Sequence, residues 1–259
     1  MTSISSAFAK AKAENRAALI GYLPAGYPTV DGAVECITAM VEGGVDIIEI
    51  GLPYSDPLMD GVTIQEAVQL SLENGTKIAD VIDTAARVST LGVATLVMSY
   101  WNPIERFGVE KFAEQLRAAG GVGVITPDLT PEEAANWIVA TDANEIDRVF
   151  LVALSSTDQR LKTVADATNG FVYAGAVMGV TGARASLGDA VSEVVARTRA
   201  VTDLPIAVGL GVSTAAQAHE IAQFADGVIV GSAFINAIAA GGPQAAHELA
   251  KDLRAGVVR

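Results

Sequence analysis

Asp46-Ile47-Ile48-Glu49-Ile50-Gly51 is a short apolar run with one carboxylate, Glu49, at its centre. Alternation along a strand places Glu49 on one face together with Ile47, while Ile48 and Ile50 lie on the other. Apolar residues on both faces are typical of a parallel strand that is covered on both sides. The run therefore predicts a buried parallel strand in which Glu49 points inward, close to the carboxyl end.

Similar apolar runs recur along the whole chain and alternate with segments of helical length and composition. The predicted strands are 18–22, 47–51, 94–99, 123–126, 148–153, 171–174, 205–208 and 227–230. The predicted helices between them are 29–43, 63–74, 77–90, 109–119, 131–141, 157–167, 187–201 and 213–223.

Repeated βα units imply parallel strands joined by right-handed crossovers. Eight such units in 259 residues predict the α/β class and a single (β/α)8 TIM barrel over residues 1–259. Extra helices are expected at the N-terminus, at 5–15, and at the periphery near Lys77 and Pro243. In such barrels the chemistry takes place where strands end and βα loops begin.

The overall composition excludes several classes of function. The chain has 30 acidic and 17 basic side chains and a formal net charge of −13, which disfavours nucleic acids and anionic lipid as partners. The single cysteine, Cys36, excludes an internal disulfide and a cysteine-built zinc site. Residues 1–18 lack the apolar core of a signal peptide, so we expect a cytoplasmic protein.

Two carboxylates near the second predicted strand are candidates for acid/base chemistry. Burial at the barrel mouth would raise the pKa of Glu49 and make it a proton donor near neutrality, although a structural ion pair is the alternative. The following loop, 52–61, contains Pro53, Asp56, Pro57 and Asp60. An Asp before a Gly, as at position 60, is also a common turn or helix-capping residue.

Glycines cluster after the last three predicted strands, in the segments 179–182, 209–211 and 231–233. Exposed backbone N–H groups and a helix N-terminus can hold a phosphate without lysine or arginine, although each glycine could simply permit a tight turn. Aromatic or flexible apolar residues end several strands, which suggests a flat apolar substrate or else ordinary core packing. These residues are Tyr22, Met98, Tyr100 and Tyr173.

Other chemistries need residue types that the predicted strand ends lack. None of the six lysines and neither histidine lies at a predicted strand end, which disfavours Schiff-base, pyridoxal phosphate and metal-dependent aldolase mechanisms. No dinucleotide or P-loop motif is present, and no metal site is expected. Carboxylate acid/base chemistry on a phosphorylated substrate, without a cofactor, remains.

The segment 49–61, followed by Thr63-Ile64-Gln65, resembles the hallmark segment of the tryptophan synthase alpha subunit family. The similarity extends back to Gly21-Tyr22 with Gly26-Tyr27-Pro28 and forward to 98–103, 127–129, 179–182, 208–212 and 231–233, and so covers nearly the whole chain in order. The family implies a barrel that cleaves indole-3-glycerol phosphate to indole and glyceraldehyde 3-phosphate. It also implies a beta subunit that carries pyridoxal phosphate, in an α2β2 complex through which indole passes.

The resemblance assigns a role to each matching residue. It implies that Glu49 and Asp60 are catalytic, and that Pro53, Asp56 and Pro57 belong to a loop that closes over substrate and communicates with the partner. The implied indole pocket consists of Tyr22, Met98, Tyr100, Ile125 and Tyr173. The implied phosphate site consists of Gly182, Gly209, Gly211, Gly231 and Ser232, and Thr181 belongs to a second loop that closes over the substrate.

The chain departs from the family pattern at one position, and two alternative functions stay open. Several family members have an arginine two residues before the Gly-Val-Thr-Gly run, where this chain has Val177. Another cofactor-free, phosphate-binding isomerase or epimerase would use the same barrel features. A regulatory subunit without catalytic activity would share the partner but release no indole.

Overall fold

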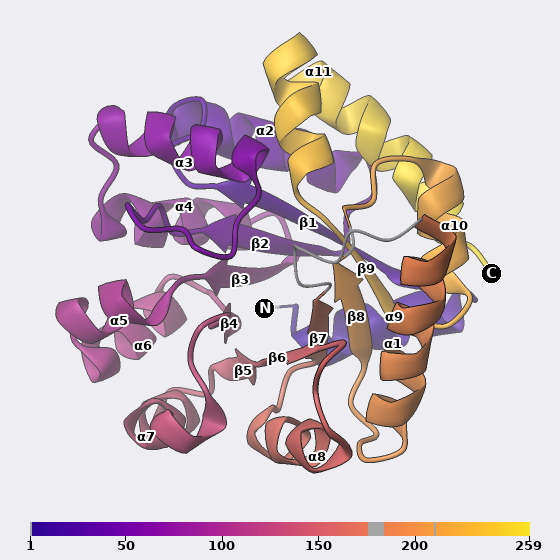
Figure 1. Ribbon diagram of the computed structural model, residues 1–259. Helices are drawn as coiled ribbons and strands as arrows, with labels where there is room; N and C mark the ends of the chain where they lie inside the picture. The colour runs from indigo at the N-terminus through magenta and orange to yellow at the C-terminus, as the bar shows by residue number, and fades with distance from the viewer. Residues whose placement is uncertain (1, 176–183, 210) are drawn as a thin grey trace.

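A parallel sheet at the centre of the molecule is surrounded by helices (Figure 1). The computed structural model describes residues 2–175, 184–209 and 211–259. The strand order is β5-β4-β3-β2-β1-β9-β8-β7-β6. The strands are β1 (Ala18–Pro24), β2 (Ile47–Gly51), β3 (Ala94–Met98), β4 (Gly123–Ile125), β5 (Asp147–Val149), β6 (Leu151–Ala153), β7 (Val172–Gly175), β8 (Ile206–Gly209) and β9 (Gly227–Val230).

The barrel closes through a single residue, Phe150. The predicted strand 148–153 is divided there into β5, which pairs with β4, and β6, which pairs with β7. The two ends of the strand order are thus consecutive in the chain, and the Phe150 carbonyl accepts a hydrogen bond from the Tyr173 N–H at 3.2 Å. The predicted (β/α)8 barrel is confirmed, with its fifth strand shared between two neighbours.

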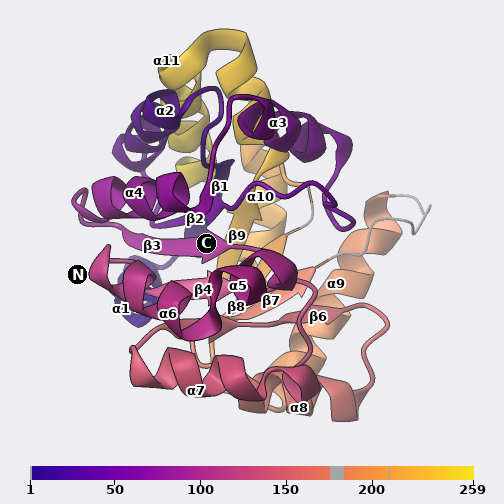
Figure 2. The same ribbon diagram turned by 90° about the vertical axis from the view of Figure 1, so that its left-hand side faces the viewer.

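Helices follow almost every strand and cover the outside of the barrel (Figures 1 and 2). Their bounds are α1 (Ile4–Ala13), α2 (Val30–Glu42), α3 (Val62–Glu73), α4 (Ile78–Ser89), α5 (Trp101–Phe107), α6 (Val109–Ala118), α7 (Ala135–Ala143), α8 (Asp158–Ala167), α9 (Arg184–Arg199), α10 (Ala215–Ala222) and α11 (Ser232–Gly256). The predicted N-terminal helix is α1, and the predicted helix near Lys77 is α4. Gly242, at φ +62°, interrupts α11, so the helix predicted near Pro243 is its second half.

The start of α7 differs from the prediction. Pro131–Glu133 forms one 3₁₀ turn, the α-helix begins only at Ala135, and the Thr130 side chain makes no capping hydrogen bond. Thr214, by contrast, caps α10 with its side chain, since its hydroxyl accepts from the Gln217 N–H at 3.3 Å.

Two apolar layers hold the barrel together. The outer layer packs the helices against outward-facing strand residues such as Ile48 and Ile50. The inner layer contains Ile20, Ile47 and Phe171, and the α1 residues Ile4 and Phe8 pack into it. Helix α1 therefore plugs the amino-terminal end of the barrel and leaves the opposite end for the site.

Within the described ranges, no helix combines the length and the apolar character needed to cross a bilayer.

Candidate active site

Strand β2 places Glu49 inside the barrel, as the alternation predicts. Ile47 belongs to the inner apolar layer, so Glu49, two residues further along, faces the same interior. In the sheet register Glu49 lies between Tyr22 of β1 and Leu96 of β3. The side chain is fully enclosed, because only 1% of the residue's surface is exposed.

In the part of the chain that the structure describes, the Glu49 carboxyl group has no compensating partner. Among the residues described, neither of its buried oxygens has a hydrogen-bond partner. Burial disfavours the charged form and raises the pKa of Glu49 to about 8. Glu49 is therefore mainly protonated at neutral pH and can donate a proton.

Asp60 differs from Glu49 in its environment and in its acidity. It lies immediately before Gly61, the N-cap residue of α3, and is half-buried. Burial raises the pKa of Asp60 to about 6, while a hydrogen bond from the Tyr100 hydroxyl acts in the opposite direction. At neutral pH Asp60 is therefore mainly ionised, and the two carboxyl groups are suited to opposite roles.

Two tyrosines connect the carboxylates into one site. Burial raises the pKa of Tyr22 and of Tyr173, and the charges of Glu49 and Asp60 raise both further. Since these interactions fall off with distance, the two carboxyl groups and the two phenols share one space at the barrel mouth.

The remaining predicted pocket residues border the same space. Met98 and Tyr173 pack against the inner apolar layer, to which Ile125 belongs. Met98 and Ile125 are register partners in β3 and β4, and Tyr100, two residues beyond Met98, is buried. The predicted pocket residues thus come from β1, β3, β4 and β7 and from the residues just beyond β3, on different sides of the barrel.

Position 209 requires glycine for a structural reason, in addition to the predicted phosphate role. A Cβ at position 209 would overlap the Tyr173 hydroxyl, and one at position 51 would overlap the Tyr22 hydroxyl. The absence of a side chain at each position therefore makes room for a phenol of the candidate pocket.

The other glycines of the predicted phosphate site follow the ends of β8 and β9. Gly211 has a φ of +64° and open space where a side chain would be. Gly231 is the N-cap residue of α11, and Ser232 is the first residue of that helix. Thr181 and Gly182, like the departure at Val177, lie outside the described residues.

The loop 52–61 exposes apolar side chains that the sequence reasoning missed. Leu58 is 90% exposed, Val62 at the start of α3 is 67% exposed and Met59 is 46% exposed. The sequence does contain a signal for this exposure, because three apolar residues lie within or beside a loop that is rich in proline and aspartate. We call Leu58, Met59 and Val62 the apolar loop patch; such clusters mark contact surfaces.

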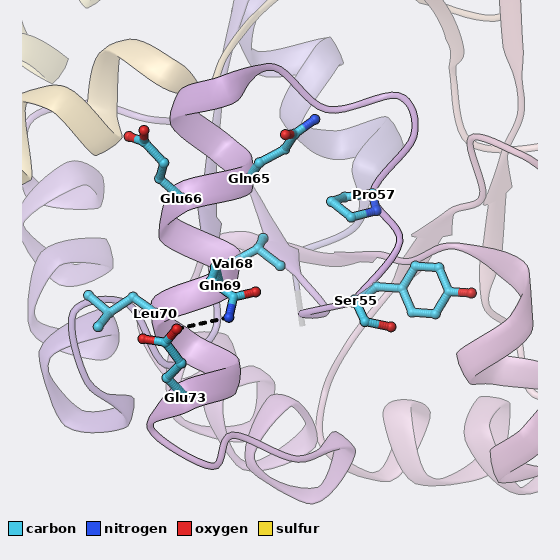
Figure 3. Close-up of a pocket in the computed structure, with 9 residues that line it drawn as sticks. Ser55, Pro57, Gln65, Glu66, Val68, Gln69, Leu70 and Glu73 are labelled. Atoms are coloured by element: carbon cyan, nitrogen blue, oxygen red, sulfur yellow. Dashed lines mark hydrogen bonds between the residues drawn. The ribbon is translucent and has the colours of Figure 1, made fainter.

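A groove of about 390 Å³ lies between this loop and α3 (Figure 3). Its lining includes Pro57, which was predicted to belong to the loop that communicates with the partner. It also includes Tyr54, Gln65 and Gln69, for which no role was predicted. The groove contains neither Glu49 nor Asp60, so we distinguish it from the barrel mouth and call it the outer groove. Within the described residues, no group of three or more His, Cys, Asp or Glu side chains is arranged to hold a metal ion.

A family model described as "Tryptophan synthase alpha chain" matches residues 8–256. The chain belongs to the tryptophan synthase alpha chain family. The resemblance carried by segment 49–61 is thereby confirmed, and so are the carbon–carbon lyase activity and the place in tryptophan biosynthesis that it implied.

Relatives in this family match along nearly their full length. The tryptophan synthase alpha chain of Mycobacteroides abscessus is 54% identical over 252 residues, which are 97% of this chain and 96% of the relative. That of Nocardia farcinica is 52% identical, over 98% and 95% of the two chains.

Solved structures of the family agree with the fold. A chain of Mycobacterium tuberculosis tryptophan synthase in space group F222 superposes with a TM-score of 0.94 at 50% identity, and 100% of both chains is covered. The alpha subunit of the Legionella pneumophila enzyme superposes with a TM-score of 0.90 at 30% identity, over 99% and 98% of the chains.

Proposed function

We propose that Glu49 and Asp60 are the catalytic pair with which this chain cleaves indole-3-glycerol phosphate into indole and glyceraldehyde 3-phosphate. The observation that carries this assignment is the buried Glu49 carboxyl group, which lacks a hydrogen-bond partner in the described chain and has a pKa raised to about 8. A general acid is most effective when its pKa lies near the working pH.

The reaction breaks the bond between indole C3 and the glycerol carbon. Glu49 delivers its proton to C3, which leaves positive charge on the indole nitrogen. Ionised Asp60 accepts the hydrogen bond of the indole N–H and stabilises that charge. Glu49, now a carboxylate, takes the proton of the glycerol hydroxyl as the aldehyde forms, and so returns to its starting state.

The substrate is oriented by the two sides of the mouth. The ring pocket consists of Tyr22, Met98, Tyr100, Ile125 and Tyr173, whose apolar surfaces suit a flat indole. The phosphate binds the backbone N–H groups of Gly182, Gly209, Gly211, Gly231 and Ser232, and Thr181 belongs to the loop that closes over it. The positive end of α11 favours this anion in spite of the net charge of −13.

The partner of the chain is a tryptophan synthase beta subunit, which supplies pyridoxal phosphate while the alpha chain itself uses no cofactor. We place Pro53, Asp56 and Pro57 at this interface, next to the apolar loop patch. An exposed patch beside the catalytic loop allows partner binding to alter the site directly. The single domain 1–259 then functions in the cytoplasm as part of an α2β2 complex.

The test is an indole-release assay with indole-3-glycerol phosphate, for the chain alone and with a beta subunit. We expect slow release that increases when the beta subunit is added. A parallel assay of phosphosugar isomerisation should show no activity. Absence of indole under both conditions would contradict the proposed function, and would favour a regulatory subunit.

A further inference from the structure

Asp60 lies in the second half of the loop, which has little apolar packing of its own, whereas Leu52 at the start of the loop is buried. Leu58 is almost completely exposed, and Ser55 and Asp56 are exposed as well. A loop that buries so little cannot fix a carboxylate by packing alone. The position of Asp60 must therefore come from hydrogen bonds to more rigid elements.

The first such hydrogen bond comes from Tyr100, just beyond the carboxyl end of β3. The Tyr100 hydroxyl accepts a hydrogen bond from the Met59 N–H at 2.9 Å, and it lies near enough to the Asp60 carboxyl group to lower the pKa of that group. The ring is buried, and the backbone of the next residue is fixed because the Trp101 N–H donates to Asp128 at 2.9 Å. The Tyr100 hydroxyl thus holds the main chain immediately before Asp60.

The second hydrogen bond comes from α3, on the other side of the loop. The Gln65 side-chain amide donates to the backbone carbonyl of Asp60 at 2.8 Å. Gly61 has no side chain with which to cap this helix. Figure 3 shows Gln65 in the first turn of α3, on the side of the helix that faces the loop. Gln65 therefore ties the main chain of Asp60 to a helix that is anchored by the buried Ala67 and Val68.

We propose that the Tyr100 hydroxyl and the Gln65 amide are positioning groups that together hold Asp60 in its working orientation. Tyr100 holds the main chain on one side of Asp60, at the Met59 N–H, and Gln65 holds the backbone carbonyl of Asp60 itself. The inference rests on the proposed role of Asp60. It adds to the pocket-lining role of the Tyr100 ring, because it concerns the hydroxyl group and not the ring.

The chain offers a matched control for each group. The Tyr54 ring lies 5.4 Å from the Tyr100 ring, but its hydroxyl accepts from Asn102 at 3.1 Å. Gln69 lies one turn after Gln65 on α3, but its amide donates to Glu73 at 2.9 Å. Tyr54→Phe and Gln69→Leu thus remove the same chemical groups without touching Asp60.

The experiment compares Tyr100→Phe and Gln65→Leu with these controls in the complex with a beta subunit. We expect each test variant to lower kcat for indole release about tenfold, with KM within about threefold of the parent value, and each control to retain parent kinetics. Thermal unfolding confirms that all four variants fold.

The same substitutions are then made in an Asp60→Asn background. Because both groups act by placing the Asp60 carboxylate, we expect each to lose most of its effect on kcat once that carboxylate is removed. Test variants that behave like their controls, or that keep their full effect in the Asp60→Asn background, would overturn the positioning role. A parent protein that releases no indole would instead overturn the proposed function itself.

Discussion

Arg16 and Glu49 are both buried ionisable side chains, at opposite ends of the barrel, with 2% and 1% of their surface exposed. The Arg16 guanidinium donates to Asp46 at 2.6 and 2.8 Å, to Glu14 at 2.8 Å and to the Ala17 carbonyl at 3.1 Å. The Glu49 carboxyl group has no such partner in the described chain.

This difference separates a structural charge from a reactive one. A buried charge is tolerated when it is paired and hydrogen-bonded, and then it serves the fold. A buried acid without a partner keeps its proton, and that proton is available to a substrate. The amino-terminal end of the barrel, closed by α1, therefore contributes stability, and the mouth contributes chemistry.

Glu49→Gln tests the reactive side of this comparison and has the largest expected effect. We expect indole release to fall by about 10²–10⁴, because the amide cannot donate and recover the proton. The variant should fold and bind substrate, since Gln resembles protonated Glu in shape. Steady-state assays and thermal unfolding measure both quantities, and turnover close to the parent rate would remove Glu49 from the mechanism.

Arg16→Met tests the structural side. We expect the free energy of unfolding to fall by about 3–5 kcal/mol, because Asp46 loses its buried partner. Indole release per folded molecule should not change. Arg87→Met is the matched control, since Arg87 pairs with Asp31 on the surface, where such pairs contribute about 1 kcal/mol or less. Denaturant unfolding that finds both variants equally stable would contradict the distinction.

Asp60→Asn should have a smaller effect than Glu49→Gln. Asn can still accept the indole N–H through its amide oxygen, but it lacks the charge that stabilises the protonated ring. We expect kcat for indole release to fall by about 10–10²-fold. An unchanged kcat would reduce Asp60 to a turn residue before α3.

The pH dependence of indole release has the smallest expected effect. The rate should fall below about pH 6, as Asp60 becomes protonated, and above about pH 8, as Glu49 loses its proton. One pH unit beyond either limit should cost about tenfold. Asp60→Asn should abolish the acid limb and leave the alkaline limb. A parent rate that still rises at about pH 9 would contradict the assignment of Glu49 as the acid.

Local patterns were sufficient to predict most elements and the orientation of Glu49. The alternation in 46–51 depends only on the geometry of one strand, and the structure confirms it. The division of 148–153 at Phe150 was not predictable in this way, because it depends on which strands close the barrel. Helix α5 was missed because it is seven residues long and contains Pro103, which weakens a helical pattern.

The contacts of the site depend on tertiary structure and were only partly predictable. The sequence suggested a phosphate role for Gly209 but could not show that the Tyr173 hydroxyl occupies the space beside it. Gln65 is an ordinary helix residue in the sequence, and only the path of the loop brings its amide to the Asp60 carbonyl. Hydrogen bonds between a loop and a neighbouring helix leave no periodic signal.

The most direct test of the proposed chemistry is a titration of the Glu49 carboxyl group. Carbon-13 NMR of protein labelled at the glutamate side-chain carboxyl, with Glu49→Gln used to assign the signal, measures its pKa without substrate. We expect a pKa of about 8, caused by burial of the carboxyl group. A value near the ordinary 4.5 would contradict the central claim that Glu49 holds a proton for catalysis at neutral pH.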